Sequence, residues 1–125
     1  MPRMMFWRRA AANREAEEGN KARDARDWGT AASHYRRYLT ARPNDFAIWV
    51  QLGHVLKESG QFIAALSAYS EALRLDAANS DLELSMGHLY KLMGHNEEAV
   101  TCYRRSADID GNGDAIAELR GLNAL

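Results

Sequence analysis

The segment from Asp108 to Asp114, DIDGNGD, carries acidic and amide side chains at the spacing of a calcium-binding loop. Oxygen ligands alternate along it and a glycine occupies the sixth place, as in the first half of an EF-hand loop. The twelfth place, where that loop requires a bidentate glutamate, is Leu119, and Glu118 lies one residue short. We therefore interpret the segment as a plain turn between helices and expect no calcium site.

Four histidines and one cysteine are further candidate metal ligands. His54 and His88 fall at equivalent places of neighbouring helices, but no third ligand stands at a matching place, and Cys102 belongs to a different helix. The sequence also contains no G-x-S-x-G, H-E-x-x-H or G-K-S/T motif. We therefore expect no metal, no cofactor and no enzyme active site.

The elements that would carry such side chains are clearest between Phe46 and Asn79. Residues spaced at i, i+3, i+4 and i+7 lie along one face of a helix. This spacing is found in Trp49, Leu52, Gly53 and Leu56. A second stripe of the same kind runs from Phe62 to Leu73, and Gly60 between them is free to adopt the left-handed conformation that ends a helix. The stretch is predicted to be a helix-turn-helix hairpin.

This hairpin repeats along the chain with a period of 34 residues. Small and aromatic residues recur at that spacing: Gly19, Gly53, Gly87 and Gly121; Ala31, Ala65 and Ala99; Tyr35, Tyr69 and Tyr103. Where two helices cross closely, only glycine or alanine leaves room for a large side chain of the partner helix. The period therefore indicates stacked helical hairpins.

The repeated hairpin resembles the tetratricopeptide repeat family over about residues 12–125. The middle unit carries the family pattern best, with Trp49, Leu52, Gly53, Ala65, Tyr69 and Ala72. Glu83 takes the place of this tryptophan in the third unit, where Ser80 and Glu83 also form a capping-box pattern. The resemblance implies an all-α, right-handed superhelical solenoid of three hairpins plus a C-terminal capping helix.

The expected organisation follows from the period. Residues 1–11 form a basic and apolar arm or an extension of the first helix, and three repeats occupy about residues 12–45, 46–79 and 80–113. Residues 114–125 form a capping helix or the start of a fourth repeat, in which case the chain would be the front part of a longer protein.

A polar face accompanies the packing stripe of each first helix. In tetratricopeptide proteins this face lines the concave groove, and the candidate partner-binding residues here are Asn20, Arg23, Gln51, His54, Lys57, Ser85, His88 and Lys91. They form a polar row of Asn20, His54 and His88 and a basic row of Arg23, Lys57 and Lys91. Such rows suit an extended peptide with acidic groups, although a merely solvated face remains an alternative. Histidines near their ordinary pKa of about 6.5 would strengthen binding of an acidic ligand as the pH falls through that value.

Clamp-type members of the family hold the acidic C-terminal peptides of heat-shock chaperones with five groove residues. The resemblance maps these onto five positions here, of which only Asn20 matches; the others are Ala16, Gln51, Asp81 and Ser85. We therefore expect no binding of such chaperone tails.

Composition limits the remaining possibilities. The net charge of −1 does not indicate binding to nucleic acid. No apolar run approaches the roughly 20 residues that span a bilayer. The single cysteine excludes an internal disulfide and favours a reducing, cytoplasmic location. Near the start, an apolar cluster beside arginines could dock a partner, a second copy of the chain or a membrane surface: Met4, Met5, Phe6 and Trp7.

Two functions are compatible with these features. The first is a non-catalytic interaction module or scaffold that binds a protein or peptide in its groove. The second is the non-catalytic leading part of a larger enzyme, and resemblance alone suggests a bacterial glycosyltransferase as the host. The sequence names neither the partner nor the oligomeric state.

Overall fold

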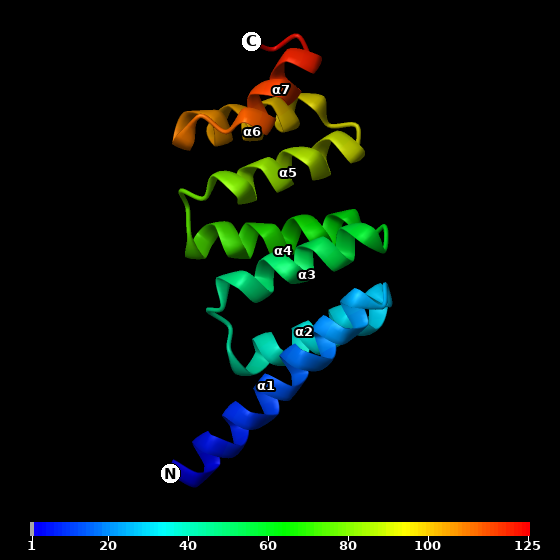
Figure 1. Cartoon of the computed structure of the whole chain (residues 1–125), viewed down its shortest axis with the longest axis vertical. Helices are drawn as coiled ribbons and strands as arrows, with labels where there is room; N and C mark the ends of the chain where they lie inside the picture. Colours follow the sequence, from blue (N-terminus) through cyan, green and yellow to red (C-terminus); the bar gives the residue numbers. More distant parts are fainter. Residues whose placement is uncertain (1) are drawn as a thin grey trace. The chain divides into compact units, whose positions relative to one another are not determined.

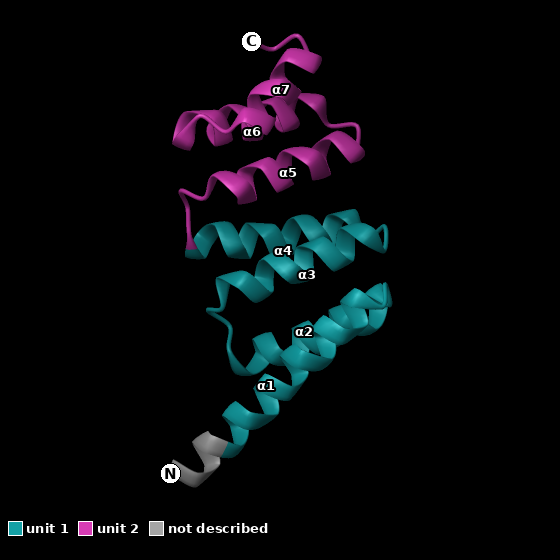
Figure 2. Cartoon of the chain, in the orientation of Figure 1, with its two compact units in different colours: residues 1–75 teal, residues 76–125 magenta. Residues whose placement is uncertain are grey.

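The computed structural model describes residues 2–125, with side chains from Trp7 onward. Within that range the chain is all-helical and has no strand, which confirms the predicted fold class (Figure 1). The helices are α1 (Pro2–Asp24), α2 (Trp28–Ala41), α3 (Phe46–Glu58), α4 (Phe62–Leu75), α5 (Ser80–Leu92), α6 (Asn96–Asp110) and α7 (Gly113–Gly121). The chain divides into two compact units, residues 1–75 and 76–125, which are described separately (Figure 2).

The first unit contains two helical hairpins, α1 with α2 and α3 with α4, and α3 also packs against α2. Asp45 begins α3, because its carboxylate accepts a hydrogen bond from the Ile48 amide and also from the Tyr38 hydroxyl. Arg42, which precedes Pro43, leaves the helical region with φ −136° and ends α2. Gly60 adopts the left-handed conformation predicted for the hairpin turn, with φ 80°.

The periodic glycines lie beneath the periodic tyrosines, as the spacing predicts. A Cβ built on Gly53 would lie 2.3 Å from Cε1 of Tyr69, and one on Gly19 would lie 2.7 Å from Cε1 of Tyr35. Both rings are fully buried, with 0% of their surface exposed. The first helix of each hairpin therefore approaches the second closely enough for a tyrosine ring to lie directly on its backbone.

The second unit consists of the hairpin α5–α6 with α7 packed on α6. Its core contains Ala99 and Tyr103 from α6 and Ala115 and Leu119 from α7. Tyr103 lies over Gly87 in the same way as in the first unit, since a Cβ there would lie 2.5 Å from Cε1 of the ring. The same packing rule thus operates in every hairpin.

The start of α5 differs from the capping-box prediction. Asn79 is the capping residue and accepts from the Leu82 amide. Ser80 is the first helical residue, and its hydroxyl donates to Asp110 at 2.8 Å instead of capping the helix. Glu83 is 3% exposed, whereas Trp49 at the equivalent place of the middle repeat is only half-buried.

The first helix, α1, begins at Pro2, so that residues 2–11 belong to the same helix as the first repeat. It has 23 residues, whereas α3 and α5 have 13 each. Of the apolar cluster near the start, the side chains of Met4, Met5 and Phe6 lie outside the described residues, and Trp7 is 65% exposed. Among residues 2–125, none of the helices has the length and apolarity needed to cross a membrane.

Candidate functional site

The eight predicted groove residues lie on the first helices of the hairpins. Five belong to the first unit, and three, Ser85, His88 and Lys91, lie on α5 in the second unit. The five of the first unit are divided between α1, with Asn20 and Arg23, and α3, with Gln51, His54 and Lys57. Each group is described within its own unit.

The predicted polar row is held by the tyrosines. Tyr35 Oη donates to Asn20 Oδ1 at 2.7 Å, and Tyr69 Oη lies 2.5 Å from His54 Nδ1. In the second unit, Tyr103 Oη lies 2.8 Å from His88 Nδ1. Each ring crosses a glycine, and its hydroxyl therefore reaches the next residue along the first helix. The sequence contained this signal, a polar residue directly after each of the first three periodic glycines and a tyrosine 15 positions later, but the pairing itself was not predicted.

The tyrosine contacts determine which histidine nitrogen carries a hydrogen. Burial raises the pKa of the Tyr69 and Tyr103 hydroxyls, so both keep their protons. Neither hydroxyl has another acceptor among residues 7–125, so each donates to the Nδ1 atom of its histidine. From this contact we infer that the neutral rings of His54 and His88 carry their hydrogen on Nε2, where it can serve as a donor.

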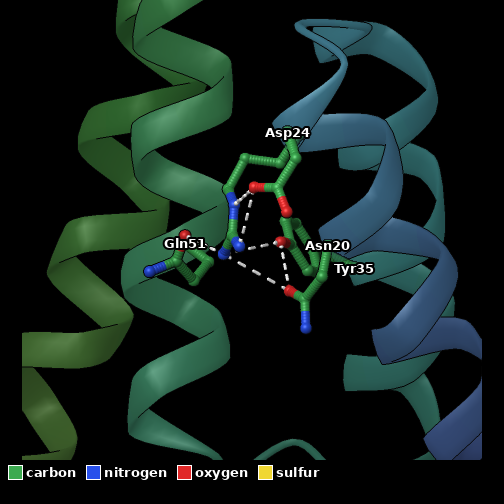
Figure 3. A network of polar contacts seen from close by, with 5 residues as sticks. Asn20, Asp24, Tyr35 and Gln51 are labelled. Atoms are coloured by element: carbon green, nitrogen blue, oxygen red, sulfur yellow. Dashed lines mark hydrogen bonds and ion pairs between the residues drawn. The ribbon is translucent and has the colours of Figure 1, made fainter.

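Arg23 joins α1 to α3 through a polar network (Figure 3). Its Nη1 donates to Gln51 Oε1 at 3.0 Å and to Asn20 Oδ1 at 3.4 Å, and its Nη2 pairs with Asp24 at 3.0 Å. The side-chain oxygens of Asn20 and Gln51 are thus occupied, whereas their amide nitrogens point away from the guanidinium (Figure 3). The sequence placed Asn20, Arg23 and Gln51 on one face but did not predict that they would bind one another.

The predicted basic row is accompanied by carboxylates. Lys57 Nζ lies 3.7 Å from Glu58, and Lys91 Nζ donates to Glu118 of α7 at 2.7 Å. With the Arg23–Asp24 pair, every cation of the row has an acidic neighbour. These pairs are partly exposed and are each worth about 0–1 kcal/mol, so they weaken the positive field of the row without removing the cations from reach.

The expected pKa of His54, on which the predicted pH dependence of binding rests, needs a correction. Burial lowers the pKa of this imidazole below its ordinary value, and the neighbouring charges of Lys57 and Arg23 lower it further, whereas Glu58 acts in the opposite direction. The expectation that His54 titrates near 6.5 is therefore wrong. The reason is that the Tyr69 contact holds the ring in a half-buried place, where the charged form is poorly solvated.

The calcium-like segment forms the end of α6 and a short turn, which agrees with its interpretation as a connection between helices. Asp108 and Asp110 lie in the last turn of α6, and Gly111 has φ 70°. Asn112 accepts from the Ala115 amide and begins α7. Within the described residues, there is no cluster of three or more His, Cys, Asp or Glu side chains that could hold a metal ion.

A buried acid–thiol pair in the second unit was missed by the sequence analysis. Glu83 and Cys102 are buried close enough for each to affect the pKa of the other, and Glu83 Oε2 has no hydrogen-bond partner in the described part of the chain. Burial is the main cause that raises the pKa of the Glu83 carboxyl, and burial with the nearby carboxylate raises that of the Cys102 thiol to about 12. A thiol with such a pKa is not a nucleophile at neutral pH.

Comparison with known proteins gives a family and a fold. A family described as tetratricopeptide repeat matches residues 56–122, which is more than half of the chain. The small glutamine-rich tetratricopeptide repeat-containing protein 2 of Mycosarcoma maydis is 26% identical over 115 residues, covering 92% of this chain and 32% of that protein. The chain thus spans about a third of the length of this curated relative.

Two solved structures are similar in fold. The N-terminal domain of stress-induced protein-1 from C. elegans has a TM-score of 0.82 at 17% identity, covering 91% of this chain and 95% of that one. The first TPR of Spaghetti (RPAP3), bound to the HSP90 peptide SRMEEVD, has a TM-score of 0.81 at 22% identity, covering 91% of each chain. At these identities the likeness establishes the arrangement of helices and leaves the ligand open.

Proposed function

This chain belongs to the tetratricopeptide repeat family, and from that premise we propose that it is a non-catalytic module that binds an extended peptide or protein segment through the polar faces of α1 and α3 in the first unit and of α5 in the second unit. The family's modules are typically protein-interaction domains, and a structural neighbour carries a bound peptide. The eight predicted residues would make the contacts: Asn20, Arg23, Gln51, His54, Lys57, Ser85, His88 and Lys91.

One observation carries the proposal: the polar faces of both units present hydrogen-bond donors. Tyrosine or arginine occupies the acceptor atom of each of four side chains, which leaves the amide nitrogens of Asn20 and Gln51 and the Nε2–H groups of His54 and His88. A ligand rich in acceptors satisfies such donors, and an extended peptide offers a carbonyl at each residue. The fixed rotamers lower the entropy that binding costs.

The charges favour acidic side chains on the partner. Lys57 and Lys91 are each paired with one carboxylate, and an ammonium group has three donors, so a ligand carboxylate can be added without breaking the existing pair. The gain is about 0.2–1 kcal/mol for each exposed pair. Charge therefore gives a modest preference for acidic segments, and the donors supply the remaining recognition.

Chaperone tails are not the partners that we propose. The peptide SRMEEVD, which the Spaghetti domain binds, would meet Asn20 as the single residue matching the clamp pattern, because the other four positions are Ala16, Gln51, Asp81 and Ser85. We expect no micromolar binding of SRMEEVD in calorimetry, and such binding would contradict this part of the proposal.

The experiment is a selection from a library of random peptides displayed on phage, with the whole chain as bait. We expect the selected peptides to be enriched in Asp and Glu. Their affinity should fall about twofold to thirtyfold in the variant Lys57→Ala/Lys91→Ala, from two pairs of about 0.2–1 kcal/mol each. Binding should also lose salt dependence in that variant.

The matched control is Lys21→Ala/Arg74→Ala, which removes two cations that also belong to exposed ion pairs, with Glu18 and Glu71. We expect the control to bind like the parent chain. Peptides with no acidic enrichment, or equal losses in both variants, would show that the face is only solvated.

The alternative is that the chain is the non-catalytic leading part of a larger enzyme, for which a bacterial glycosyltransferase is the proposed host. The observation in its favour is that the curated relative is about three times as long as this chain. Sequencing of the gene decides the question, because a reading frame that continues beyond Leu125 into a catalytic domain is required. For location, we propose the cytoplasm, because Cys102 is a free buried thiol.

A further inference from the structure

The N-terminal part of α1 departs from the repeat pattern and brings cations together. Residues 42–45 form the turn between hairpins, but the residues one period earlier, 8–11, are helical. This continuation places Arg8 and Arg9 beside the end of α2. The end of α2 contributes four more residues to the same pocket: Arg37, Thr40, Ala41 and Arg42.

These six residues line an open pocket of about 580 Å³ within the first unit. Four of them are arginines, and no acid is among the lining residues. Glu15 lies 3.8 Å from Arg37 but also binds His34 at 2.6 Å, and Asp45 is bound to Tyr38. In a chain whose net charge is −1, this pocket is therefore a local concentration of positive charge.

The chemistry of the lining favours phosphate. All four cations are arginines, whose planar guanidinium groups match the oxygens of a phosphate with two parallel hydrogen bonds. The Thr40 hydroxyl adds a donor. Four arginines within one pocket cost repulsion that a polyanionic ligand relieves, so the site is suited to several phosphates held side by side.

The neighbouring residue favours a lipid surface over a soluble polyanion. Trp7, directly before Arg8, is 65% exposed. An indole prefers the boundary between lipid headgroups and acyl chains, and stable attachment to a membrane surface requires an apolar and a basic signal together. A second copy of the chain is disfavoured, because identical faces would bring eight arginines together.

We propose that the pocket of Arg8, Arg9, Arg37 and Arg42 binds the phosphate groups of an anionic membrane surface, with Trp7 inserted at the headgroup level. The chain would then lie against the membrane through α1 and the end of α2, and none of its described helices would cross it. This attachment is independent of the peptide-binding face of α1 and α3, which uses other residues.

The test is cosedimentation of the whole chain with vesicles of phosphatidylcholine alone and of phosphatidylcholine mixed with phosphatidylserine. We expect binding to the mixed vesicles only, and weaker binding at higher salt. The variant Arg8→Gln/Arg9→Gln should bind them about tenfold to thirtyfold more weakly, from about 1 kcal/mol for each arginine near an anionic surface. Trp7→Ala should also weaken binding.

The control variant Arg26→Gln/Arg120→Gln removes two exposed arginines outside the pocket and gives the same net charge. Circular dichroism checks that every variant remains helical. Equal vesicle binding by the two double variants would overturn the proposal, as would equal binding to both kinds of vesicle.

Two further arms identify the competing occupants. If polyglutamate binds with the same dependence on Arg8 and Arg9 while the vesicles do not, the occupant is an acidic protein and the membrane proposal is wrong. If gel filtration shows a dimer that Arg8→Gln/Arg9→Gln dissociates, the pocket is instead an interface between copies of the chain.

Discussion

Replacement of Gly53 by alanine tests how the structure positions the candidate site. The new Cβ would lie 2.3 Å from Cε1 and 2.4 Å from Cδ1 of Tyr69, whereas carbon atoms in contact normally lie about 3.5–4.0 Å apart. To restore a normal carbon–carbon distance, the Tyr69 ring or the α3 backbone would have to move by more than about 1 Å. Because Tyr69 is 0% exposed and its ring is surrounded, it has little room to move.

The magnitude follows from two opposing effects. Alanine in place of glycine inside a helix normally stabilises by about 1 kcal/mol, and overpacking of a buried site costs about 1–3 kcal/mol or more. With contacts this short, we expect a net loss of about 1–2 kcal/mol. For a chain of this length, that lowers the melting temperature by roughly 3–10 °C.

The assay is thermal unfolding followed by circular dichroism, with Gly121→Ala as the control. Gly121 stands at the same repeat position, but a Cβ there meets nothing within 4 Å. The control should unfold at the temperature of the parent chain or slightly above it. If Gly53→Ala were as stable as the control, the close packing of Tyr69 on α3 would be wrong, and with it the reason for the His54 hydrogen bond.

Three further outcomes are expected. Glu83→Gln should raise the melting temperature at pH 7 more than at pH 4, because the pKa of the buried carboxyl is raised and its ionisation destabilises the fold as the pH rises; an equal change at both pH values would contradict its burial as the cause. Nitrogen-15 NMR at pH 8 should find His54 and His88 as the Nε2–H tautomer, and Tyr69→Phe should increase the share of the Nδ1–H tautomer at His54 alone; a preference for Nδ1–H in the parent chain would remove the proposed donors. The parent chain should lose stability as the pH falls below about 6.5 toward the lowered pKa of His54, and His54→Gln should reduce this loss. If the variant and the parent chain lost the same stability on acidification, His54 would not titrate as described.

The sequence predicted the fold well because its signals are local and repeated. The 34-residue period of glycine, alanine and tyrosine implied close helix crossings, and the resemblance to tetratricopeptide repeats drawn from it is confirmed by the family match. The left-handed turn at Gly60 was also predicted, from its place between two helical stripes. Helical period and glycine turns both act within a few residues of where they occur.

The candidate site was predicted only as a set of residues on one face. Helical spacing indicates which side chains point in the same direction, but it does not say which of them bind each other. The Arg23–Gln51 contact joins positions 28 apart and Lys91–Glu118 joins positions 27 apart, so both depend on how helices pack. The burial of Glu83 was missed for a different reason: a glutamate three positions after a serine suggests a helix cap, and the packing of the third hairpin overrides that local pattern.

The most direct test of the central claim is a nitrogen-15 NMR titration of the side-chain N–H groups with a peptide obtained from the library selection. The donors on the proposed face should respond at saturation, with shifted signals from the amide groups of Asn20 and Gln51 and from Nε2 of His54 and His88. The Trp49 indole, which donates to the Pro43 carbonyl at 2.7 Å, serves as the internal reference and should not shift. If the peptide binds while the four donor signals stay in place, recognition occurs elsewhere on the chain and the proposed face is wrong.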